Sequence, residues 1–350
     1  MALSMLNADS AGPAATGYWK NWRRNLFGIA ISCACLGFIA WRIDLDDVLQ
    51  AISHFRWPYL FWGLLSLTGG YIVRIVRWST ILRAAGADVS SVACASPYLG
   101  SIALNNVLPI RLGDVVRALV FPSAIGVGKA MATGSLVMER LLDLMTLLAC
   151  LVIGLVISSK VQLPDWLANA AVSLAVLSGI ALALVFFFSG ILSRWCNRLI
   201  DGSCVRGHDR RVRLVTALRN LLGSFEAMSR IPVLISLFVL SMLIWMGEAG
   251  LFWALLYGFG LEAGPETAVV VMAIATLSTM VPSSPGYIGP FHLAAYIAIS
   301  MLGGTPGQAA SFAVLSHLGL WLPTTLAGAV AILINPQLFS RVRSGTATSQ

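Results

Sequence analysis

The residues around position 111 have the types and spacing needed to bind an anion. Arg111, Asp114 and Arg117 lie in an otherwise apolar stretch, where ionisable groups are costly and are candidates for function. Pro109 and Gly113 predict a helix break that would hold Arg111, whose guanidinium can grip a phosphate with two parallel hydrogen bonds. Asp114 and Arg117 are three residues apart and would be neighbours on a helix. For Asp114, a structural pair with an arginine and a role in binding are both open.

A second group of charges begins twenty-odd residues later. Glu139 and Asp143 are four residues apart, so a helix would place both carboxylates on one face, with Arg140 beside them. Two carboxylates on one face need a cation between them, and Arg111 or Arg117 is the expected one. A structural network is the favoured interpretation. A proton relay is the alternative, because neighbouring carboxylates can share a proton.

Further polar residues interrupt the apolar runs. Arg74 and, more strongly, Arg77 are expected to extend toward a membrane interface. Glu248 lies 174 positions after Arg74, deep in an apolar run, where it would face a cavity or pair with a neighbouring helix. His292 and His317 flank a second helix break and are interpreted first as buried core residues. Five tryptophans fit interfacial belts: Trp57, Trp62, Trp166, Trp195 and Trp321.

The composition indicates whether these charges belong to a soluble protein or to a membrane protein. Hydrophobic residues make up 58% of the 350-residue chain and charged residues 11%, and the mean hydropathy is +0.83. A soluble domain has about 25% charged residues, so a soluble enzyme, a disordered chain and a disulfide-stapled secreted fold are excluded. The net charge of +8 lies mostly between the apolar runs, which does not favour nucleic acid as a partner. The sequence predicts an all-α polytopic membrane protein.

Apolar runs of about 20 residues, the length needed to cross a bilayer, predict six full transmembrane helices. They are 25–41, 57–82, 130–159, 167–192, 232–258 and 308–334. The arginine-rich loop 193–230 is expected in the cytoplasm by the positive-inside rule. The tails 1–24 and 336–350 are expected there too, which leaves 25–335 as one membrane domain.

Two further apolar regions, 92–125 and 266–303, are interrupted by proline and glycine. Pro109 and Gly113 recur as Pro282 and Gly286, an offset of 173 in each case. Each half is therefore predicted to consist of a transmembrane span, a broken hairpin and a second span. Repeat 1 covers 57–159 and repeat 2 covers 232–334. The span between the halves inverts the second copy, so the two re-entrant hairpins would open to opposite sides and meet at a binding cavity. Simple kinks at the two prolines are the alternative.

The sequence lacks the motifs of several common enzyme and metal-binding classes. The chain has no Walker A sequence, nucleophile elbow or HExxH pattern. Cys196, Cys204 and His208 do not have zinc-ligand spacing. No cofactor and no metal are expected.

The sequence resembles the lysylphosphatidylglycerol synthase transmembrane family, also called flippase-like, in four places. These are the stretches 105–117, 139–143 and 282–289 and the pattern Arg74-x-x-Arg77-Trp78. The resemblance covers roughly residues 20–335. The resemblance implies a bacterial inner-membrane protein that moves a lipid between leaflets. The lysyltransferase domain of two-part members is absent from this sequence, so lysyl transfer is not implied. Family members often carry Phe-Glu after the second motif, whereas Phe291 is followed here by His292.

Two functions are compatible with these features. The first is a flippase that moves a phosphate-bearing lipid: an anionic phospholipid, an aminoacylated phosphatidylglycerol or a polyprenyl-phosphate-linked lipid. The second is a non-transporting scaffold for an envelope-biosynthesis enzyme. The lipid, the coupling ion and the oligomeric state are left open. The expected substrate-binding residues are Arg74, Asn106, Pro109, Arg111, Gly113, Asp114, Arg117, Glu139, Arg140, Asp143, Glu248, Pro282, Ser283, Gly286 and His317.

Overall fold

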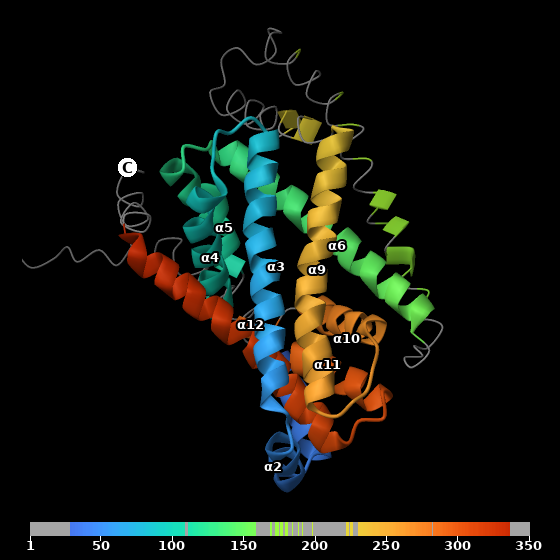
Figure 1. Cartoon of the computed structure of the whole chain (residues 1–350). Coiled ribbons are helices and arrows are strands. Elements are labelled where there is room, and N and C mark those ends of the chain that lie inside the picture. The colour runs from blue at the N-terminus through green and yellow to red at the C-terminus, as the bar shows by residue number, and fades with distance from the viewer. Residues whose placement is uncertain are drawn as a thin grey trace, which may run out of the picture.

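A computed structural model describes residues 29–108, 111–158, 230–281 and 283–336, with scattered positions between 169 and 226. Within these residues the chain is helical and contains no strand, which confirms the all-α membrane class (Figure 1). The elements are the helix Ile29–Arg42, α2 (Leu45–Ser53), α3 (Trp57–Ala84), α4 (Ser91–Val107), α5 (Leu112–Leu119), η2 (Phe121–Ala124), α6 (Lys129–Ile157), α9 (Ile231–Gly258), α10 (Pro265–Ser278), η4 (Pro285–Tyr287), α11 (Pro290–Met301) and α12 (Pro306–Ile334).

Four of the six predicted spans are long apolar helices. These are α3, α6, α9 and α12, each 28 or 29 residues long, and their ends lie within two residues of the predicted ones. At about 1.5 Å per residue, each is longer than the roughly 30 Å hydrocarbon core. Proline in the first turn of α3, α9 and α12 marks their starts, where it removes no helical hydrogen bond. The span at 167–192 lies mostly outside the described residues, so the number six stays a prediction.

Both interrupted regions are broken helices. The first consists of α4, α5 and η2, and the second of α10, η4 and α11. Pro109 and Pro282 themselves lie outside the described residues. The backbone turns through positive φ at Arg111 (52°) in the first break and at Gly286 (74°), Tyr287 (60°) and Gly289 (105°) in the second. At Gly289 a Cβ would also overlap the backbone of Ser32, so glycine lets the helix Ile29–Arg42 approach the second break.

The helices of the two halves pack in a reciprocal pattern. α4 packs on α12, and its counterpart α10 packs on α6, while α3 and α9 pack on each other. In Figure 1, α3 ascends from α2 whereas α9 descends beside it, and α4 and α5 lie in the upper half whereas α10 and α11 lie in the lower half. The two halves thus run in opposite directions. The assignment of the halves as inverted repeats, with hairpins that re-enter a bilayer, stays a prediction.

The contact between α3 and α9 depends on small residues. A Cβ on Gly247 would lie 2.7 Å from the Cα of Gly70 and 2.9 Å from its nitrogen. The Ser66 hydroxyl donates a hydrogen bond to the Gly247 carbonyl at 3.0 Å. Close backbone approach through glycine and serine is a common way for helices to associate in lipid, where the hydrophobic effect supplies little.

We expect Gly247→Ala to destabilise the protein, because the added methyl group would force α3 and α9 apart at a cost of about 1–3 kcal/mol. Gly69→Ala is the matched control, since a Cβ there meets nothing within 4 Å. Thermal unfolding in detergent should show a lower midpoint for Gly247→Ala only. Equal unfolding midpoints for the two variants would show that α3 and α9 can move apart at this contact without loss of stability.

Candidate functional site

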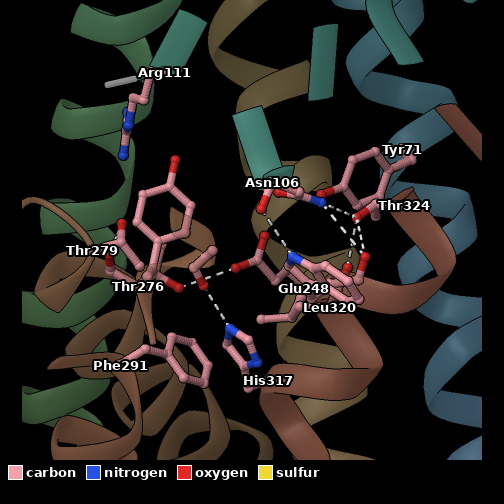
Figure 2. Close-up of a pocket in the computed structure, with 13 residues that line it drawn as sticks. Tyr71, Asn106, Arg111, Glu248, Thr276, Thr279, Phe291, His317, Leu320 and Thr324 are labelled. Atoms are coloured by element: carbon pink, nitrogen blue, oxygen red, sulfur yellow. Dashed lines mark hydrogen bonds between the residues drawn. The ribbon is translucent and has the colours of Figure 1, made fainter. Parts of the chain in front are cut away.

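A cavity of about 150 Å³ lies where the two helix breaks meet α3, α9 and α12 (Figure 2). We call it the central cavity. Its lining is Tyr71, Asn106, Arg111, Glu248, Thr276, Thr279, Gly286, Tyr287, Phe291, His317, Leu320, Trp321 and Thr324. Both breaks contribute residues, so two segments about 170 positions apart in the sequence line one pocket.

The first break is anchored to α12 by hydrogen bonds from Asn106, near the end of α4. The Asn106 amide donates to the hydroxyls of Thr324 (3.0 Å) and Thr325 (2.9 Å). In return, the Trp321 indole N–H donates to the Asn106 carbonyl at 3.2 Å. These bonds satisfy the freed end of α4 and fix it at the cavity wall.

The second break is anchored to the same helix. The imidazole Nε2 of His317 lies 2.6 Å from the Gly286 carbonyl oxygen. A Cβ on Gly286 would lie 3.2 Å from the Trp321 indole nitrogen and 3.4 Å from the Asn106 carbonyl oxygen. Only glycine combines this left-handed backbone with so close an approach to the first break. The ring of His292 lies 4.6 Å from that of His317, so the two histidines form a buried pair.

The charges at the central cavity leave one cation in excess. Glu248 accepts a 2.8 Å ion pair from Arg74 and a 3.0 Å hydrogen bond from the Thr276 hydroxyl. Arg111 stands over the Tyr287 ring, 5.3 Å from its centroid, and makes no ion pair with the part of the chain that the structure describes. Figure 2 shows Arg111 at one edge of the view, apart from Glu248 near its centre.

The other predicted charges form a separate group, which we call the arginine–carboxylate network. It contains Arg77, Arg117, Arg140, Asp114, Glu139 and Asp143. Three arginines and three carboxylates balance in it, and all but Arg140 are buried. This balance favours the structural interpretation over a site that binds a charged ligand.

Arg77 belongs to the network and bridges two of its carboxylates, contrary to expectation. Its guanidinium lies 2.7 Å from Asp143 and 3.4 Å from Glu139, and donates to the Ser241 hydroxyl at 2.8 Å. The prediction that Arg77 extends to an interface was therefore wrong, because it is fully buried (0% exposed). The prediction that Arg111 or Arg117 bridges Glu139 and Asp143 was also wrong in part, since Arg117 pairs with Glu139 while Arg77 is the residue that contacts both.

Arg117 is enclosed rather than available. It lies 2.8 Å from Glu139, its side chain is 3% exposed, and its guanidinium stacks over the rings of Tyr98 (4.6 Å) and Trp78 (5.2 Å). Asp114 accepts hydrogen bonds from Asn105 at 2.9 Å and Arg140 at 3.0 Å. The α5 helix thus contributes its charges to the network, while Arg111 at its start faces the cavity.

The remaining expected residues are distributed as follows. Asn106, Arg111, Glu248, Gly286 and His317 line the cavity, and Arg74 pairs with Glu248. Gly113 packs where a Cβ would overlap the Ser101 carbonyl, and Ser283 bonds weakly to the Ser284 carbonyl at 3.5 Å, outside the lining. Among the described residues, no three His, Cys, Asp or Glu side chains are grouped to hold a metal. Cys196, Cys204 and His208 lie outside the described residues.

Several lining residues were not predicted. Trp321 was expected at an interface but lies in the cavity, hydrogen-bonded to Asn106. Tyr71, Thr276, Thr279, Tyr287 and Thr324 carry no charge, so nothing in a hydropathy pattern distinguishes them. Their positions within a turn or two of Arg74, of the second break and of His317 are the signal that would have found them.

Comparison with known proteins agrees with the resemblance in the sequence. The family described as "Lysylphosphatidylglycerol synthase TM region" matches residues 25–328. Two UPF0104 membrane proteins of Methanothermobacter thermautotrophicus are similar: one is 25% identical over 73% of this chain and 79% of its own length, the other 22% over 88% and 93%. The glycosyltransferase AglD of Haloferax volcanii is 22% identical over 83% of this chain, which spans 51% of that relative's length.

Removal of Arg77 is expected to destabilise the fold strongly. Arg77→Met would leave Glu139 and Asp143 buried with too little positive charge, at a cost of about 3–5 kcal/mol. Arg140→Gln is the control, because that side chain is 42% exposed and its loss should cost about 1 kcal/mol or less. Thermal unfolding in detergent measures the stability of both variants. The double variant Arg77→Met/Asp143→Asn should recover part of the stability that Arg77→Met loses. Equal stability of Arg77→Met and Arg140→Gln would contradict a central role for Arg77.

Proposed function

The chain belongs to the lysylphosphatidylglycerol synthase transmembrane-region family, and we propose that it moves a phosphate-bearing lipid between the leaflets of a bacterial inner membrane. The observation that carries the proposal is Arg111. It lies at a helix break, lines a cavity between two such breaks, and has no anionic partner among the described residues. A guanidinium in that position is a binding site for a phosphate.

The broken helices support a transport role. Backbone groups freed at membrane depth must face protein or water, because lipid offers no hydrogen bonds. Paired broken helices of this kind hold the substrate in many secondary transporters. The start of α5 at Leu112 adds its helix dipole to the positive charge of Arg111. The α5 terminus and Arg111 together favour an anion.

The size of the cavity supports a headgroup as its occupant. About 150 Å³ is less than the roughly 300–1,000 Å³ of sites that enclose a whole small molecule. In our proposal the headgroup enters the cavity while the acyl or prenyl chains stay in lipid. Movement of the two hairpins relative to α3 and α9 would then open the cavity to each leaflet in turn.

The proposal includes an orientation. The basic loop 193–230 would lie in the cytoplasm together with both termini, in keeping with the positive-inside rule. Arg77 and Arg117 are buried in ion pairs and Arg74 is paired with Glu248, so we leave these three arginines out of that rule. We propose no catalytic role for the chain.

A scaffold function is the second candidate. One observation favours it: a relative named glycosyltransferase contains a region similar to this chain within about half of its length. In that case the membrane domain would present a lipid to an enzyme of envelope lipid or glycan synthesis without moving it. The lipid-binding cavity would be needed in both cases, whereas leaflet exchange would be needed only in the first.

We expect Arg111→Gln to lower leaflet exchange of phosphatidylglycerol in proteoliposomes by about tenfold or more, because a charge-assisted hydrogen bond to phosphate contributes about 1.5–3 kcal/mol. Fluorescent short-chain lipid and dithionite quenching from outside measure the exchange. Arg83→Gln is the matched control, since Arg83 is exposed and its hydrogen bonds to described residues are to Ser79 and Thr80 of α3.

The outcomes separate the two candidates. Exchange that depends on Arg111 and not on Arg83 supports the transporter. Folded wild-type protein that exchanges neither phosphatidylglycerol nor a polyprenyl phosphate overturns it and favours the scaffold. Exchange that survives Arg111→Gln would refute the assignment of the phosphate site while leaving transport intact.

A further inference from the structure

We infer that the central cavity selects a lipid headgroup that combines an anionic phosphate with uncharged hydroxyl groups, such as glycerol or a sugar, and excludes one that carries an ammonium group. The inference rests on the proposed function and specifies its substrate class. It therefore separates the substrates that the sequence left open: phosphatidylglycerol or a glycosylated lipid phosphate is accepted, and aminoacylated phosphatidylglycerol is rejected.

The first argument is the state of the cavity's carboxylate. Glu248 is the acidic residue among the lining residues, and an ammonium group would need it as a partner. Each of its oxygens already has a partner: Oε2 pairs with Arg74 at 2.8 Å and Oε1 accepts from the Thr276 hydroxyl at 3.0 Å. Arg74 and Glu248 cancel, so the lining keeps the positive charge of Arg111. Once the lipid phosphate has paired with Arg111, an ammonium group on the same headgroup would find no carboxylate in the lining that lacks a cation, in a region of low dielectric constant.

The second argument is the direction of the hydroxyl hydrogen bonds. The hydroxyls of Thr276, Thr279 and Thr324 all donate to protein acceptors, namely Glu248, the Thr276 carbonyl and the Leu320 carbonyl. A hydroxyl has one donor and two lone pairs, so these side chains keep acceptor capacity, although one lone pair of Thr324 already accepts from the Asn106 amide. A phosphate needs donors and gains nothing from them, whereas a ligand hydroxyl is a donor that suits them. The phosphate is thus left to Arg111 and the hydroxyls to the threonines.

The third argument is the aromatic part of the lining. Tyr71, Tyr287, Phe291 and Trp321 contribute apolar ring faces beside the polar groups. Trp321 is held in place because its indole N–H is bonded to the Asn106 carbonyl. A site with fixed apolar walls and a few placed polar groups suits a compact ring or a polyol. It does not suit a long flexible side chain such as a lysyl group, whose ordering costs entropy.

Lipid binding to the purified protein tests the inference directly. Native mass spectrometry would compare four lipids with identical acyl chains: phosphatidylglycerol, phosphatidic acid, phosphatidylethanolamine and lysylphosphatidylglycerol. We expect phosphatidylglycerol to bind most tightly, phosphatidic acid less tightly because it lacks the hydroxyls, and lysylphosphatidylglycerol at least about tenfold more weakly than phosphatidylglycerol. Preference for lysylphosphatidylglycerol, or equal binding of all four, overturns the inference.

A charge variant tests the mechanism of exclusion. Arg74→Met frees an oxygen of Glu248 and removes a positive charge, so binding of lysylphosphatidylglycerol relative to phosphatidylglycerol should rise by about tenfold or more. Arg74→Met/Glu248→Gln is the control, since it removes the same cation but offers no carboxylate. We expect the double variant to stay selective against the cationic lipid. A preference unchanged in Arg74→Met would refute the role assigned to the ion pair.

The same lipids in the leaflet-exchange assay keep the two proposals distinguishable. Selective binding without exchange of any lipid would refute transport and leave the headgroup class supported. Exchange without selectivity would support transport and refute the headgroup class. If Arg74→Met does not fold, the four-lipid comparison with the wild-type protein decides the inference by itself.

Discussion

Backbone groups released at the two helix breaks must find hydrogen-bond partners, and the architecture of the site follows from how they do so. The Asn106 carbonyl accepts from the Trp321 indole, and the Gly286 carbonyl lies within hydrogen-bond distance of the His317 imidazole. Trp321 and His317 are four residues apart on α12, hence on one face of it. The third partner, Ser32, donates to the Ile288 carbonyl at 2.6 Å. One face of α12 therefore holds both breaks in register, and the cavity is the space that remains between them.

Two groups of buried charge lie near these breaks, and their difference defines their roles. In the arginine–carboxylate network every side chain has an opposite partner, which offsets the cost of removing the charges from water. At the central cavity Arg74 and Glu248 neutralise each other in the same way, but Arg111 has no carboxylate partner among the described residues. Closed pairs fix helices relative to each other, whereas an unbalanced cation at a cavity favours an anion from outside. The site is thus determined less by where arginines occur than by which of them lacks a carboxylate.

The sequence predicted where the helices and their breaks lie better than it predicted which side chains contact each other. Apolar length identified α3, α6, α9 and α12, and the recurring proline and glycine located both breaks, because these features depend on local composition. Glu248 was expected to face a cavity or to pair with a neighbouring helix, and it does both, since it lines the central cavity and pairs with Arg74 of α3. Arg77 and Trp321 were misplaced since hydropathy records depth along a span and not the direction in which a side chain points. That direction depends on the crossing of α3 with α9 and of α4 with α12, which no local pattern encodes.

Arg111 and Tyr287 form a direct contact between the two helix breaks. They are the described non-glycine residues with positive φ, 52° and 60°, a conformation that costs about 1–3 kcal/mol each when it persists at such sites. One lies in each break, and the guanidinium of the first stands over the ring of the second. A guanidinium stacks on a ring through its face and binds phosphate through its in-plane N–H groups, so Tyr287 would hold Arg111 and leave those groups for the phosphate. A contact between the two breaks would thereby orient the residue that binds the substrate.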